Sequence, residues 1–136
     1  MTALQTAAVR RELNKFIGNA SKFIALDVGI ELEADTPKLT TFASKNWVPQ
    51  VGSAFEGLSG VRSLNSPIDT TLRDTGIDSL ERYTISKGAI YITNNVPYIG
   101  LLNSGTSTKA PRNFVQKAIA KGIAKTLSRP NSDFTG

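Results

Sequence analysis

Residues 3–32 read ALQTAAVRRELNKFIGNASKFIALDVGIEL, and the spacing of their apolar side chains decides most of the fold. Apolar residues recur at steps of three and four, which is the period of an amphipathic helix with one apolar face. They are Val9, Leu13, Phe16, Ile17, Ala20, Phe23, Ile24 and Val28. The helix ends at Asp35-Thr36-Pro37, because the residue before a proline is pushed out of the α region. We therefore predict a long N-terminal helix over residues 3–34.

This helix is long for a small domain. At 1.5 Å per residue it spans roughly 40 Å, so we expect one end to extend past the body of the domain or to meet a neighbour. Gly18 and Gly29 each cost about 1 kcal/mol relative to alanine in a helix interior, so an early end at Gly29 is the alternative.

Two short strands are predicted downstream. Residues 46–53 (NWVPQVGS) form one of them, with Pro49 at an edge or a bulge because proline has no N–H for a sheet ladder. Residues 89–95 (AIYITNN) carry the strongest strand pattern in the chain, with β-branched residues bounded by polar turn formers.

Two further helices are expected, over residues 70–83 and from Pro111 to about Leu127. The first should turn three side chains toward the core, namely Leu72, Leu80 and Tyr83. These elements predict an α+β fold in which the long N-terminal helix and the C-terminal helix pack on a small, mainly antiparallel sheet. Residues 1–129 form a single domain, residues 53–69 a mobile loop, and residues 130–136 a flexible tail.

The 136-residue chain contains neither cysteine nor histidine. This excludes disulfides, thiolate or imidazole metal sites, and catalysis by either side chain, and we expect no metal and no cofactor. Charged residues begin at Arg10, which leaves no room for the apolar core of a signal peptide. No apolar run reaches the ~18 residues of a membrane-spanning helix. We expect a soluble intracellular protein with no membrane partner.

The net charge of +5 is concentrated in the last third of the chain. Between residues 84 and 136, Asp133 is the only acidic side chain, against Lys87, Lys109, Arg112, Lys117, Lys121, Lys125 and Arg129. Lys117, Lys121 and Lys125 follow at four-residue steps and so share one face of the final helix. This lysine stripe fits a solvated face, contact with an acidic neighbouring subunit, or attraction to nucleic-acid phosphates.

Two motifs suggest enzymes, and neither is complete. Gly100 and Gly105 have the spacing of a phosphate-binding loop, but that loop needs lysine after the second glycine, where this chain has Thr106. Asp74-Thr75-Gly76 matches the triplet of retroviral-type aspartic proteases, but charged side chains flank it and no apolar strand leads into it. We predict no enzymatic activity.

Several blocks of the chain together resemble a known family. A strand runs into Asn94-Asn95-Val96-Pro97-Tyr98, a loop follows at Leu101-Leu102-Asn103-Ser104-Gly105-Thr106-Ser107, and Lys109-Ala110-Pro111 opens the last helix. Upstream, Thr36-Pro37 and Asn46-Trp47 precede Gly52. In order and spacing these blocks resemble the neck or tail-completion proteins of long-tailed bacteriophages over residues 36–127. The chain departs from that pattern at Leu39-Thr40-Thr41 and at Asn103.

The resemblance implies a non-catalytic α+β subunit that forms a ring at the head–tail junction, completes the tail and surrounds the DNA path. We expect six-fold rather than twelve-fold symmetry. The implied partners are further copies of the chain, the tail terminator or tail tube, the head-completion or connector proteins, and genomic DNA by proximity without sequence specificity. The implied location is the neck or tail of the virion, and the host cytoplasm during assembly.

Small and polar side chains of the matched stretch can approach a neighbour's backbone and replace its hydrogen bonds to water. The candidate interface residues are Asn94, Asn95, Pro97, Tyr98, Asn103, Ser104, Gly105, Thr106 and Ser107. The lysine stripe is a candidate face toward the DNA channel or a partner. Structural roles are expected for Pro37, Pro111 and Trp47, the last buried with its indole N–H bonded. The alternative function is a small basic nucleic-acid-binding module.

Overall fold

The computed structural model describes residues 2–37, 42–58, 70–105 and 112–135. The elements within them are α1 (Ala3–Asp35), η1 (Ser44–Asn46), β1 (Val48–Val51), α2 (Thr71–Glu81), η2 (Ile85–Lys87), β2 (Ile90–Thr93), α3 (Ile99–Asn103), α4 (Phe114–Leu127) and α5 (Ser132–Thr135). Some predictions concern residues outside the described ranges, and these residues are 59–69 of the expected mobile loop, Thr106, Ser107 and Pro111.

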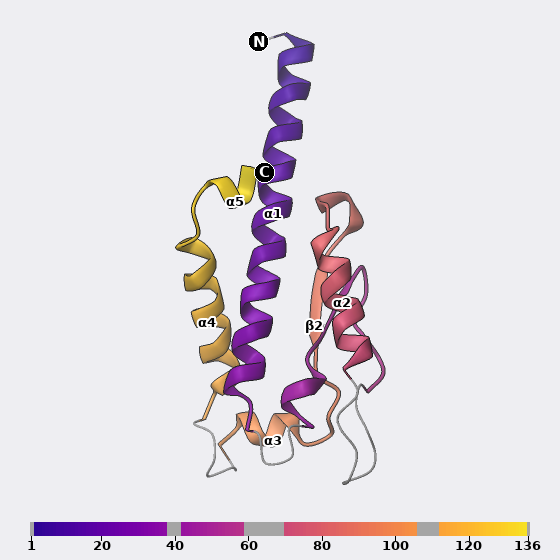
Figure 1. Ribbon diagram of the computed structural model, residues 1–136, viewed down its shortest axis with the longest axis vertical. Coiled ribbons are helices and arrows are strands. Elements are labelled where there is room, and N and C mark those ends of the chain that lie inside the picture. Colours follow the sequence, from indigo (N-terminus) through magenta and orange to yellow (C-terminus); the bar gives the residue numbers. More distant parts are fainter. Residues whose placement is uncertain (1, 38–41, 59–69, 106–111, 136) are drawn as a thin grey trace.

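Helix α1 runs through the middle of the molecule, with α4 and α5 along one side and the sheet with α2 along the other (Figure 1). β1 and β2 pair antiparallel, with Val48 opposite Thr93 and Val51 opposite Ile90, and α2 packs on β1. The predicted α+β class, with a long N-terminal helix, a C-terminal helix and a small antiparallel sheet, is confirmed.

Local sequence sets both ends of α1. At its start, the Thr2 hydroxyl accepts a hydrogen bond from the backbone N–H of Gln5, and the Gln5 side chain accepts one from the backbone N–H of Thr2. At its end, Thr36 is extended and Pro37 follows, as predicted. The helix continues through Gly29 without a break.

The N-terminal part of α1 extends beyond the rest of the molecule (Figure 1). In the described residues 2–17 no side chain is buried, and Val9 and Leu13 are 54% and 56% exposed. We call residues 3–15 the projection. The expectation that one end of this helix extends past the body is confirmed.

The second half of α1 packs closely on α4. A Cβ added to Gly122 would lie 2.5 Å from the Cα of Val28, so only glycine allows the two backbones to come this near. The core cluster continues from this crossing to the sheet and consists of Val28, Leu32, Trp47, Phe114 and Ala118.

Trp47 is 8% exposed, and its indole N–H donates to the hydroxyl of Thr36 at 2.8 Å. The prediction of a buried tryptophan with a bonded N–H is confirmed. The same bond joins the end of α1 to the start of β1, which fixes the direction in which the chain leaves the long helix.

The described residues 130–135 correct the prediction of a flexible tail over residues 130–136. Ser132–Thr135 form α5, and Phe134 is only 7% exposed. Its ring packs against Phe16 and Phe23, with centroids 5.4 and 6.0 Å away. The prediction is wrong because the apolar site that holds Phe134 is on α1, far away in the sequence.

A smaller correction concerns α2. Leu80 and Tyr83 are buried as predicted, whereas Leu72 is 45% exposed in the first turn of the helix. Gly76 explains how α2 approaches the sheet, since an added Cβ would lie 2.1 Å from the carbonyl oxygen of Pro49.

Candidate functional site

The described candidate interface residues lie at the end of the molecule that carries α3, opposite the projection (Figure 1). They belong to the chain between β2 and α4 and are Asn94, Asn95, Pro97, Tyr98, Asn103, Ser104 and Gly105.

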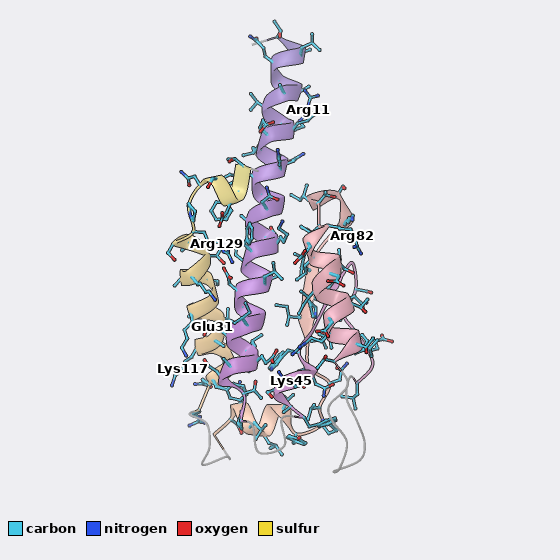
Figure 2. All side chains as sticks on the ribbon, in the orientation of Figure 1. Arg11, Glu31, Lys45, Arg82, Lys117 and Arg129 are labelled. Carbon is cyan, nitrogen blue, oxygen red and sulfur yellow. The ribbon has the colours of Figure 1, made fainter. Side chains whose placement is uncertain are left out.

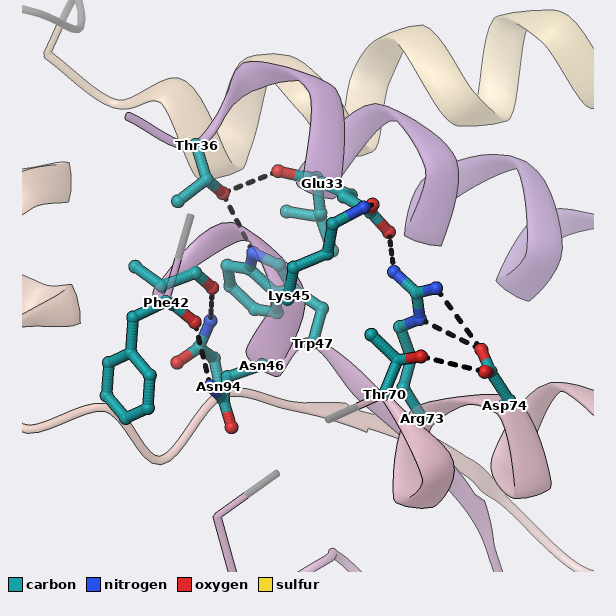
Figure 3. A network of polar contacts seen from close by, with 12 residues as sticks. Glu33, Thr36, Phe42, Lys45, Asn46, Trp47, Thr70, Arg73, Asp74 and Asn94 are labelled. Carbon is teal, nitrogen blue, oxygen red and sulfur yellow. Dashed lines mark hydrogen bonds and ion pairs between the residues drawn. The ribbon is translucent and has the colours of Figure 1, made fainter. Parts of the chain in front are cut away.

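Two of these residues use their amides within the chain. Asn94 Nδ2 donates to the carbonyl of Ala43 at 2.9 Å (Figure 3), and its side-chain oxygen accepts from a backbone N–H two residues on. Asn95 Nδ2 donates to the carbonyls of Phe55 and Gly57, both at 2.8 Å. The pair therefore ties residues 42–58 to the end of β2, and contact of these asparagines with a neighbouring subunit stays a prediction.

Asn103 caps α4 from outside that helix. Its side-chain oxygen accepts from the backbone N–H of Val115 at 2.9 Å, and its backbone carbonyl accepts from Asn113 at 2.8 Å. Asn113 itself has a left-handed backbone, with φ of 61°, and makes no side-chain cap. The first N–H groups of a helix lack acceptors within it, so Asn103 supplies the capping acceptor that the Asn113 side chain does not provide.

The remaining residues at this end are available to a neighbour. Pro97, Ser104 and Gly105 are exposed, and Tyr98 is 39% exposed. The side chain of Leu101 is 61% exposed, was not among the predicted interface residues, and adds exposed apolar area to this surface. An exposed leucine in a short helix carries no signal in the sequence, since its helical face is known only from the fold.

The lysine stripe lies on an exposed face of α4. Lys117, Lys121 and Lys125 are all exposed, and Figure 2 shows Lys117 on the outer side of α4, away from α1. Lys121 Nζ lies 2.7 Å from a carboxylate oxygen of Asp35, and this hydrogen bond raises the pKa of Lys121. One of the three charges is thus partly neutralised within the chain.

A polar network holds α1, η1 and α2 together around Glu33 (Figure 3). The carboxylate of Glu33 accepts from Lys45 and, at 2.6 Å, from Arg73. Arg73 also contacts Asp74, which accepts from the hydroxyl of Thr70 at 2.9 Å. These contacts connect segments that are far apart in the sequence.

Asp74 is the carboxylate of the protease-like triplet, and its surroundings favour the charged form. The hydrogen bond from Thr70 is the main cause that lowers the pKa of Asp74, and the adjacent Arg73 lowers it further. A shared-proton carboxylate pair needs the opposite, a group that holds a proton in an apolar setting. Asp74 is instead exposed and ionised on the surface of α2.

Sequence reasoning missed a buried ion pair. Asp27 is 0% exposed and accepts from Arg129 Nε at 2.9 Å, Arg129 Nη2 at 2.7 Å and the Thr126 hydroxyl at 2.7 Å. Burial alone would raise the pKa of Asp27, but these hydrogen bonds and the charge of Arg129 lower it below its usual value. The available signal was an aspartate between Leu26 and Val28, on a helix face that is otherwise apolar.

The described residues also form open apolar surfaces. A groove of about 530 Å³ runs between α1, α4 and β2, and its exposed walls include Ile24, Ile119 and Ile123. A hollow of about 510 Å³ lies on α1 beside the end of α5. It is lined by Ala8, Val9, Glu12, Leu13, Phe16 and Thr135.

Among the described residues, no cluster of three or more acidic, cysteine or histidine side chains is placed to hold a metal ion. Within the same part of the chain, no helix has the length and apolar character needed to cross a membrane. Comparison of the chain with protein-family models, curated proteins and solved structures found no match.

Proposed function

We propose that this chain is a structural subunit of a bacteriophage neck, which assembles with further copies into a ring that completes the tail and surrounds the path of the DNA. The observation that carries the proposal is the uncovered apolar face of the projection. The resemblance of residues 36–127 to neck and tail-completion proteins supplies the setting, and six-fold symmetry is proposed with it.

The uncovered face favours an assembly part over a free-standing protein. Val9 and Leu13 of the projection are more than half exposed, and Phe16 and Ile17, which follow it at the edge of the body, are each still 40% exposed. A helix that projects without a partner is marginal in water, because most helical stability in proteins comes from packing an apolar face. Contiguous exposed apolar surface of this kind is typical of interaction sites.

The opposite end of the molecule supports the same proposal. Pro97, Tyr98 and Leu101 are exposed there, in the stretch that carries the resemblance. A subunit in the neck needs one surface for copies of itself and others for the parts above and below it. We propose that the projection binds copies of the chain and that the α3 end binds a head-completion or tail protein.

The lysine stripe is the proposed face toward DNA. Lys117 and Lys125 are exposed, and clustered positive charge attracts phosphates without reading bases. Repeated around a ring, such charges would surround the DNA without gripping one sequence.

The test uses particles assembled without this chain, in the phage that encodes it. Electron microscopy should show filled heads and separate tails, and adding the purified chain should join them. A variant with Tyr98→Ala and Leu101→Ser should fold normally and fail to join them, whereas Leu72→Ser, which changes an exposed leucine on α2, should act as the wild type. Normal joining in the absence of the chain would refute the proposed function.

The nucleic-acid-binding module is the competing outcome. In that case the purified chain, as a monomer, would bind double-stranded DNA tightly at physiological salt. Gel-shift measurements across salt concentrations distinguish the two functions, since a neck subunit requires only weak attraction that is lost as salt rises.

A further inference from the structure

The apolar residues of α1 are spaced as in a helix that packs against another helix. Val9, Leu13, Phe16, Ala20 and Phe23 follow one another at steps of four, three, four and three residues. This alternation is the pattern of a coiled-coil seam, in which each apolar side chain packs against a partner helix. We call these five residues the seam.

Within the chain, α5 covers only the part of the seam from Phe16 to Phe23. Phe134 of α5 packs on Phe16 and Phe23, and Asn19 beside them donates to the Phe134 carbonyl at 2.8 Å. Above α5 the seam continues through Val9 and Leu13 into the open hollow of about 510 Å³. Within the described residues, α5 therefore packs on one part of the seam, and the part at Val9 and Leu13 stays exposed.

The two flanks of the open seam carry opposite charges. Arg10 follows Val9 on one flank, and Glu12 precedes Leu13 on the other. Residues two apart on a helix do not face each other, so this pair is not satisfied within one helix. None of the ion pairs in the described part of the chain includes Arg10 or Glu12.

We propose that the projections of neighbouring copies pack side by side and parallel around the ring, with the open seam of each copy packed at its contact with the next and Arg10 of each copy facing Glu12 of the next. In a parallel bundle, the right flank of one helix meets the left flank of its neighbour, so opposite charges meet at every contact. In a two-fold antiparallel pair, equal flanks meet, and Arg10 would face the basic flank of its partner. The charges therefore favour a second copy whose projection lies beside the first and runs in the same direction. The inference rests on the proposed function only in needing several copies.

The first experiment is sedimentation of the full chain over a range of concentrations. Leu13→Asn should weaken self-association by about tenfold or more, because an apolar side chain no longer leaves water. Leu4→Asn is the matched control, since Leu4 is 83% exposed but lies on the outer side of the helix, away from the seam. It should associate as the wild type does. Circular dichroism should show that both variants keep the folded body.

The second experiment tests the charges. Arg10→Glu should weaken association, and so should Glu12→Arg, because each places like charges face to face. The double variant should restore association, since opposite charges meet again. Arg11→Glu makes the same charge change one residue away, on the outer side of the projection (Figure 2), and should have little effect.

The third experiment tests the direction of packing. The chain has no cysteine, so a protein with Arg10→Cys and Glu12→Cys should cross-link only through those positions. Under oxidation it should give a ladder of dimers, trimers and larger species on a non-reducing gel. Efficient dimers from Arg10→Cys alone would indicate that equal flanks meet, as in an antiparallel pair, and would overturn the parallel bundle.

Two further outcomes separate this inference from the proposed function. If Leu13→Asn associates as the wild type does, the ring uses another surface, so the bundle is refuted while the neck function stands. If the wild type stays monomeric but Leu13→Asn still blocks joining of heads to tails, another protein covers the seam and the bundle is refuted. A separate observation would refute the proposed function, namely that particles assembled without the chain still join heads to tails normally.

Discussion

The guanidinium of Arg129 donates two hydrogen bonds to the buried carboxylate of Asp27, at 2.9 and 2.7 Å. This pair joins the chain after α4 to the second half of α1. The same guanidinium lies over the ring of Phe23, 4.2 Å from its centroid, and its remaining nitrogen contacts Asp133 at 3.2 Å. Arg129 therefore positions α5 on α1. Helix α5 in turn covers the part of the seam at Phe16 and Phe23.

We expect this pair to make stability fall in acid. The pKa of Asp27 is lower in the folded chain than the usual value of about 3.9, so the unfolded chain binds the proton more readily. The stabilisation is therefore complete above the unfolded pKa and is lost as the pH falls through the folded pKa. Urea unfolding followed by Trp47 fluorescence should show this loss below about pH 4.

Asp27→Asn is the matching variant. At pH 7 it should reduce the free energy of unfolding by about 3–5 kcal/mol, because it leaves a charged guanidinium without its buried partner. Its stability should then depend less on pH in acid than that of the wild type. Asp133→Asn removes only the more exposed contact of Arg129 and should cost far less. Equal acid sensitivity of the wild type and Asp27→Asn would contradict the assignment.

Two glycine-to-alanine changes should have opposite effects. Gly122→Ala places a Cβ 2.5 Å from the Val28 Cα and should reduce the free energy of unfolding by about 1–3 kcal/mol through overpacking. Gly29→Ala meets nothing within 4 Å in the interior of α1 and should stabilise the chain by roughly 0.5–1 kcal/mol. Thermal melting of the two variants against the wild type tests the close crossing of α1 and α4.

The contact of Trp47 with Thr36 should also be measurable. Trp47→Ala should cost about 3–5 kcal/mol as a large core truncation. Thr36→Val keeps the shape of the side chain but leaves the indole N–H without its acceptor, and should cost about 1–3 kcal/mol. Urea unfolding gives both values. A Trp47→Ala protein with an unchanged melting temperature would show that the indole does not belong to the core.

Asn103→Ala should destabilise α4. Loss of the side-chain acceptor for the Val115 N–H should cost about 1 kcal/mol, as for other helix caps. Ser104→Ala is the neighbouring control, because the Ser104 hydroxyl only donates to an exposed backbone carbonyl, and its change should be close to zero. The difference in urea midpoint between these two variants measures the cap.

The lysine stripe should affect DNA more than stability. Changing Lys117, Lys121 and Lys125 to Gln should leave the urea midpoint of unfolding nearly unchanged, since all three are exposed. Retention on DNA at low salt should fall. The double change at Lys117 and Lys125 should account for most of that loss, because Asp35 already pairs with Lys121. An equal loss from Lys121→Gln alone would contradict this ranking.

Local pattern was enough to predict the main elements. The three- and four-residue spacing of α1, its end before Pro37, and the strand pattern around Ile90–Thr93 all depend on neighbours in the sequence. The burial of Trp47 could be predicted for a related reason, since a large aromatic side chain on a short strand loses most by staying in water.

The candidate site was less predictable, because its hydrogen bonds connect distant segments. The amides of Asn94, Asn95 and Asn103 looked available to a neighbour, but in the fold they bond to Ala43, to the chain near Phe55, and to the start of α4. An asparagine shows its donors and acceptors in the sequence, but only the fold brings their partners within reach.

By itself, the sequence determined that α1 has one continuous apolar face from Val9 to Val28, because that face follows from side-chain spacing along a single helix. Only the tertiary structure decided which part of the face is covered. Phe134 and α4 cover the part of it from Phe16 onward, and among the described residues α5 ends at Thr135 while α1 reaches back to Ala3. Coverage depends on where separate elements end relative to one another, and that is set by packing between residues far apart in the chain.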